Sequence, residues 1–161
     1  VLDPEVLAWR ISTDKIGGFL NDFFEFRSFV EPNAAKSAAS GGRRDEIEEA
    51  RSTLELMREL EVSSPFGPKF VEVDVQFHKA IFAAADNEFL RGMGRTLDIP
   101  MRLSFTLHSY MKVGPGDRLA LHESVLDAIE RGDGQRAFDE SLGLISRVQH
   151  DLQRILPREE V

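Results

Sequence analysis

The sequence predicts an all-α fold, an antiparallel bundle of six to seven helices, and three observations support this prediction. Apolar residues recur at intervals of three and four along almost every segment, as they do on one face of a helix. No stretch sustains the apolar–polar alternation that is typical of a half-buried strand. Glycine and proline gather in short clusters between the periodic segments, so the connections are short and neighbouring helices are expected to run antiparallel.

The first predicted helices are bounded by a capping pair and by proline. Asp3 followed by Pro4 is an N-cap and first-turn pair, and it opens a short helix through Trp9. A second helix is expected over about 14–31, where Pro32 ends or kinks it. An alanine-rich continuation then leads to a Ser-Gly-Gly break.

The remaining predicted helices are separated by turns that contain proline or glycine. A third helix is expected over roughly 44–62, and the turn at 65–68 separates it from a fourth over 70–85. The fifth is expected over 88–111 with a bend at Pro100. The last two are expected over 117–131 and from the Gly132-Asp133-Gly134 turn to about residue 156.

Composition limits the classes of function that the chain can have. Its 161 residues, 42% of them hydrophobic, suffice for a single compact domain over 1–161. A net charge of −8 opposes a groove for a phosphate backbone, so we expect no direct nucleic-acid binding by this chain. Because cysteine is absent, a metal ion would have to be held by histidine and carboxylate. No apolar run approaches the roughly 18 residues needed to cross a bilayer, so we expect no membrane partner. The absence of cysteine fits a reducing compartment, and we expect a cytoplasmic location.

The first residues read like the interior of a longer protein. The chain starts with Val1 rather than methionine, and no signal-peptide pattern follows. We therefore expect that a preceding part of the protein is missing from this chain.

Two polar residues interrupt the apolar face of the predicted helix over 70–85. At about 100° per residue, Asp74 and His78 fall inside its apolar arc. A buried carboxylate needs a partner, and the four-residue spacing lets a carboxylate oxygen and an imidazole nitrogen reach one metal ion. The alternative is an ordinary hydrogen-bonded pair of these two side chains. The arc itself consists of Phe70, Val73, Phe77, Ile81 and Ala85.

Two more predicted helices turn a polar residue toward their apolar side. His122 lies on the buried side of its helix, where it is either a ligand or a hydrogen-bonded core residue. Arg27 lies within a wide apolar face and requires a carboxylate, which either a bound acid or Glu31 one turn on can supply. His108 lies at the edge of an apolar arc and fits either a pocket or the surface.

Five motifs in order carry a family resemblance. They are the stretch at 2–9, Arg-x-x-x-Glu-Pro at 27–32, Asp-x-x-x-His at 74–78, Ala-Asp-Asn-Glu-Phe-Leu at 85–90 and His-Glu-Ser-Val-Leu-Asp-Ala-Ile at 122–129. Together they resemble the FCD domain, the ligand-binding C-terminal half of FadR-type regulators in the GntR superfamily of bacterial transcription factors. The resemblance covers nearly the whole chain and points to the branch that responds to sugar acids.

The resemblance implies a metal site. In the metal-containing members of the family, the residues that match Asp74, His78 and His122 bind a divalent ion, and we expect Zn²⁺, Ni²⁺ or Mn²⁺ here. A further histidine usually lies on the last helix of the family. The corresponding residue in this chain is Leu144, so the expected set of protein ligands is incomplete.

The resemblance also implies an effector and a mode of action. Arg27 matches the arginine that faces the carboxylate of the effector, and Arg102 and Asn87 are further effector-binding candidates. The expected effector is a small carboxylic acid, such as a sugar acid, that bridges the cation and Arg27. We expect a homodimer in which a missing N-terminal winged-helix domain binds operator DNA under allosteric control.

An enzymatic function is not expected. Hydrolysis at a metal would require a general base and an electrophilic clamp, and the sequence offers no such set, no phosphate-binding loop and no serine elbow. The alternative that stays open is a metal-dependent enzyme acting on a small organic acid. A dimerisation module with a metal-free pocket is a further alternative.

Overall fold

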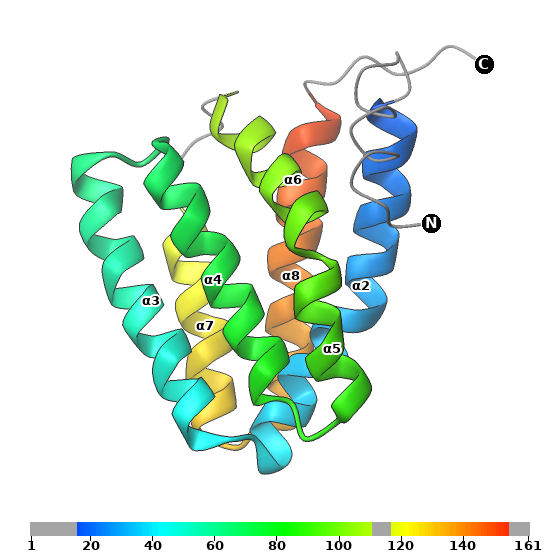
Figure 1. Ribbon diagram of the computed structural model, residues 1–161, viewed down its shortest axis with the longest axis vertical. Coiled ribbons are helices and arrows are strands. Elements are labelled where there is room, and N and C mark those ends of the chain that lie inside the picture. The colour runs from blue at the N-terminus through cyan, green and yellow to red at the C-terminus, as the bar shows by residue number, and fades with distance from the viewer. Residues whose placement is uncertain (1–15, 111–116, 155–161) are drawn as a thin grey trace.

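Over the part of the chain that the structure describes, residues 16–110 and 117–154, this computed structural model consists of helices without a strand (Figure 1). This confirms the predicted all-α class. In chain order the helices are α2 (Ile16–Gly41), α3 (Arg44–Ser63), α4 (Pro68–Ala84), α5 (Glu88–Thr96), α6 (Asp98–Tyr110), α7 (Arg118–Glu130) and α8 (Gly134–Gln153). The predicted helix over 3–9 and the predicted end of the last helix near 156 lie outside the described residues.

Helix α4 runs through the middle of the bundle. It packs against α3 on one side, α5 and α6 on another, and α2 on a third (Figure 1). Helix α7 joins the two halves of the fold because it contacts α3, α8 and α2. The core therefore surrounds α4, whose buried apolar side chains include Phe70, Phe77 and Phe82. Any polar residue on the inner faces of this helix is held away from water.

Pro32 does not end the second helix, which corrects one boundary predicted from the sequence. Helix α2 continues through Pro32 to Gly41. The side-chain amide of Asn33 donates to the Phe29 carbonyl over 2.6 Å, in the turn where a proline ring disturbs backbone hydrogen bonding. Three of the four alanines of the continuation are buried and hold it against the core. They are Ala34, Ala35 and Ala38.

The segment 88–111 is broken at Leu97 rather than bent at Pro100, which corrects a second prediction. Helix α5 ends there, and α6 starts at the next residue. A proline ring clashes with the carbonyl four residues earlier, which belongs to Thr96, so proline at this point favours a break in the helix. Pro100 instead occupies the first turn of α6, where its missing N–H costs little. Leu97 is itself buried and anchors the break in the core.

Across the described ranges, each helix is too short or too polar to cross a lipid bilayer.

Candidate metal and effector site

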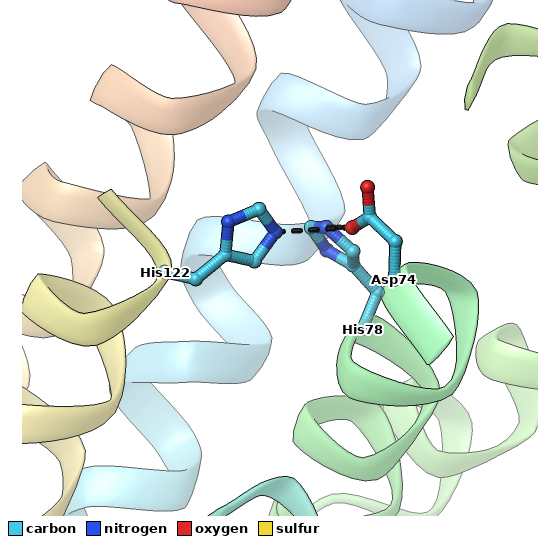
Figure 2. Close-up of side chains that lie close together, drawn as sticks. All are labelled: Asp74, His78 and His122. Atoms are coloured by element: carbon cyan, nitrogen blue, oxygen red, sulfur yellow. Dashed lines mark hydrogen bonds and ion pairs between the residues drawn. The ribbon is translucent and has the colours of Figure 1, made fainter. Parts of the chain in front are cut away.

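Asp74, His78 and His122 meet in the interior of the bundle. Their ligand atoms all lie within 4.8 Å of one another, and all three side chains are buried. Asp74 Oδ1 is 3.0 Å from His122 Nε2 and 3.5 Å from His78 Nε2. Figure 2 shows His122 reaching across from α7 toward Asp74 and His78 on α4. The structure thus brings together the three residues predicted as metal ligands.

The outer nitrogens of both histidines are held by oxygen acceptors. His122 Nδ1 donates to the Arg118 carbonyl over 2.7 Å, and His78 Nδ1 lies 2.8 Å from Glu31 Oε2. Since each Nε2 also faces Asp74, all four ring nitrogens point at oxygens. A neutral imidazole has a single N–H donor and cannot donate to two acceptors, whereas a cation shared by the Nε2 atoms and the carboxylate would suit all of these contacts. Histidines that bind metals typically have the outer nitrogen fixed in this way. The residues present therefore fit a divalent metal ion.

A buried ion pair lies next to this cluster. Arg27 and Glu31 form a bidentate pair on one face of α2, with the guanidinium 1% exposed. The intrahelical partner considered for Arg27 from the sequence is thereby confirmed. Although burial alone would raise the pKa of Glu31, the charges of Arg27 and His78 outweigh it and lower the pKa to about 2. Glu31 is therefore ionised and neutralises Arg27.

The carboxylate of the cluster is held ionised as well. Burial raises the pKa of Asp74, but the charges and hydrogen bonds of His122 and His78 lower it well below the usual range. For His78, burial lowers the pKa, while Glu31 and Asp74 outweigh burial and raise it. The interior thus stabilises positive charge between the two carboxylates, which is also what a bound cation would supply.

Two further cation-forming side chains face the cluster from the side of α6 and α7. Arg118 is 7% exposed, and its guanidinium carbon lies 4.0 Å from the centre of the Phe70 ring. His108 is buried beside it, with Nδ1 3.5 Å from Arg118 Nη1, so it belongs to the interior rather than the surface. Burial lowers the pKa of both groups. The sequence prediction missed Arg118, although its position one turn before His122 places both on the same helical face.

Three small voids adjoin these residues, and Leu144 lines all three. The first void reaches Glu31 and His78. The second, the middle void, shares residues with both of the others and reaches the metal-ligand cluster and both buried arginines. The third, the outer void, leads from Arg118 to the at least partly exposed residues Arg147 and Asp151 of α8. Their water-accessible volumes are about 10, 10 and 20 Å³, so each holds about one water molecule. A larger ligand requires the surrounding side chains or helices to move apart.

The other two predicted effector contacts lie elsewhere in the structure. Asn87 is exposed and caps α5, where its side chain accepts from the N–H groups of Phe89 and Leu90. Arg102 binds Glu72 and Asp98 in a partly exposed network. The structure does not bring either residue to the cluster, and their effector contacts stay predictions.

The family model for the FCD domain matches residues 22–146, which include every residue of the cluster. The chain belongs to the FCD domain family. This confirms the resemblance seen in the five motifs. It also sets the predicted ligand-type residues within a domain found in GntR-type transcription regulators.

The relatives of this FCD domain are transcription regulators rather than enzymes. The Galactonate operon transcriptional repressor of Escherichia coli K12 is 25% identical over 96% of this chain and 66% of its own length. The uncharacterised HTH-type regulator YieP of the same organism is 26% identical over 85% of this chain and 58% of its own length. A solved GntR structure from Streptococcus agalactiae has the same fold, with a TM-score of 0.69, 21% identity, and coverage of 84% of this chain and 60% of that one. The chain thus spans about three fifths to two thirds of the length of these proteins.

Proposed function

We propose that this FCD domain senses a small carboxylic acid, with sugar acids as the first class to test, at the buried cluster beside α4. The observation that carries the proposal is the set of four imidazole nitrogens that all face oxygen acceptors around Asp74. A cation shared by these groups would resolve the arrangement, and an acid would complete its coordination. The galactonate regulator among the relatives supports the class of acid.

Asp74, His78 and His122 would hold the divalent ion, for which Zn²⁺, Ni²⁺ and Mn²⁺ are candidates. When bound, the ion supplies a Lewis-acidic anchor for oxygen atoms of the effector. Glu31 and the Arg118 carbonyl fix the ring orientation of the two histidines. Arg27 lines the middle void with its Nη1 atom unpaired in the described structure, so it offers a hydrogen bond to a carboxylate.

Sensing would work through the packing of the bundle. The voids have room for about one water molecule each, so an acid fits only where α4, α6, α7 and α8 separate slightly. A ligand that binds one packing more tightly shifts the population toward it. In the whole protein, this shift would change operator binding by an N-terminal winged-helix domain, most simply within a cytoplasmic homodimer.

A thermal-shift screen tests the proposal. The chain is melted with Zn²⁺, Ni²⁺ or Mn²⁺, with a panel of aldonates and dicarboxylates, and with both together. We expect the metal to raise the melting temperature, the acid to raise it further, and both shifts to be lost in His122→Ala. Arg51→Met, which removes one partner of a surface ion pair with Glu130, is the control and should respond like the wild type. An acid-induced shift that survives unchanged in both Arg27→Ala and His78→Ala would rule out this pocket.

A further inference from the structure

Arg118 is a buried cation that forms no ion pair within the described residues, although the more distant charges of Asp74 and Glu61 act on it favourably. Its side chain is buried, with 7% of the residue exposed. Among the described residues, its Nε has no hydrogen-bond partner. Its neutral contacts are a 3.0 Å hydrogen bond to the Pro65 carbonyl and the face of Phe70. Arg27, by contrast, is already neutralised by Glu31. An uncompensated buried charge is costly, so the interior favours an anion at Arg118 more than at Arg27.

His108 adds a second unused donor at the same place. Its Nδ1 faces an Arg118 N–H, which can only donate, so Nδ1 accepts and Nε2 carries the proton. That Nε2 has no hydrogen-bond partner among the described residues, since the nearest carboxylate oxygen, Asp151 Oδ2, is 3.9 Å away. The guanidinium and the imidazole are thus in contact, and each keeps one unpaired donor for an oxygen acceptor such as a carboxylate.

The position of Arg118 also suits a ligand that must reach the metal-ligand cluster. It lines the middle void together with Asp74, His78 and His122. It also lines the outer void, whose other members include Arg147 and Asp151, both at least partly exposed. Arg118 therefore lies between the exposed end of the row of voids and the cluster.

We propose that Arg118, assisted by His108, is the primary anchor for the carboxylate of the effector. The inference rests on the proposed function and refines it. The ligand class is a small hydroxy acid whose carboxylate pairs with Arg118 while other oxygens extend toward Asp74, His78 and His122. Arg27, fixed by Glu31, then shapes the opposite wall of the site and makes the weaker contact.

The test compares matched arginine variants of the full chain. Binding of galactonate, gluconate, malate and citrate is measured by calorimetry with and without Zn²⁺, and neutral galactitol serves as the uncharged control. In Arg118→Met we expect the acid affinity to fall about tenfold or more, and in Arg118→Lys by less, because lysine keeps the charge but loses the bidentate geometry. Arg27→Met should weaken binding less than Arg118→Met. Arg51→Met is the surface control.

The melting temperature of the ligand-free protein separates an anchor from a structural residue. Removing an uncompensated buried cation while keeping its apolar bulk should leave that temperature unchanged or raise it in Arg118→Met. A fall in melting temperature together with unchanged acid affinity would overturn the inference. Acid binding that is lost in Arg27→Met and retained in Arg118→Met would also overturn it, while leaving the proposed function intact. If none of the acids binds the wild type, the proposed function fails and the inference fails with it.

Discussion

Among single residues, Glu31 supplies the buried negative charge that both Arg27 and His78 contact in the interior. Glu31→Gln keeps the shape but leaves Arg27 buried without a counter-charge. We expect the free energy of unfolding of the metal-free protein to fall by about 3 kcal/mol, measured by urea denaturation. The control is Glu130→Gln, which breaks a partly exposed pair with Arg51 and should cost less than about 1 kcal/mol. Similar losses in both variants would contradict the importance assigned to the buried pair.

Leu144 is the residue that the family resemblance matches to a further histidine of the metal site. It is buried, and it lines the voids next to both His78 and His122. We expect Leu144→His to raise the affinity for Zn²⁺ about tenfold or more, because it adds a fourth protein ligand. The metal-free protein should lose about 1–3 kcal/mol from the buried polar ring. Competition with a chelator measures the affinity, and Leu144→Met, which preserves volume, should leave it unchanged. Equal affinities in the two variants would contradict this geometry.

Helical periodicity predicted that four polar side chains point inward, because apolar residues at intervals of three and four mark the buried face of a helix. The four are Asp74, His78, His122 and Arg27. Periodicity could not show that Arg27 prefers Glu31, since that choice depends on competing partners in three dimensions. Arg118 was overlooked because it lies at the start of its helix, although its position one turn before His122 already indicated an inward direction. The unpaired donors that distinguish it are visible only in three dimensions, where Arg118 meets His108, Pro65 and Phe70.

Between elements, the ion pair of Glu72 on α4 with Arg102 on α6 makes the free energy of unfolding depend on pH. Hydrogen bonds from Arg102 and Gln76 lower the pKa of Glu72 from 4.5 to about 2. Because the folded pKa is the lower one, this stabilisation is present above pH 4.5 and is lost as the pH falls toward 2. Glu72 is 38% exposed, so we expect less than about 1 kcal/mol. The difference in unfolding free energy between wild type and Glu72→Gln should shrink over this range, and a difference independent of pH would contradict the assignment.

The turn between α7 and α8 depends on Gly132, whose φ is +72°. Alanine is disfavoured in this left-handed conformation, so Gly132→Ala should destabilise the protein by about 1 kcal/mol. Gly143→Ala is the matched control because Gly143 lies on the exposed side of α8 with open space around it. It should stabilise the protein by about 0.5–1 kcal/mol. Chemical denaturation of both variants measures the effects, and changes of the same sign would contradict the argument.

The helices themselves were largely predictable because their boundaries carry local signals such as prolines, glycines and capping residues. The two errors have a common physical cause. At Pro32, burial of the following alanines outweighs the local cost of proline. At Pro100, the steric effect acts four residues upstream, and the burial of Leu97 fixes where the chain turns. Both outcomes depend on packing between elements rather than on the segment alone.

For the whole molecule, the closed interior and the proposed metal–acid site lead to a linkage prediction. Metal and acid would share one cavity, and oxygen atoms of the acid would complete the coordination of the metal. Each ligand should therefore bind more tightly when the other is present, by the same factor, which we expect to be about tenfold. Calorimetric titration of galactonate with and without Zn²⁺, and of Zn²⁺ with and without galactonate, measures the two factors independently. The variant His122→Ala, which removes one proposed ligand, should reduce both factors to about one. Acid affinity that does not change on adding Zn²⁺ to the wild type would show that the two ligands do not share this site.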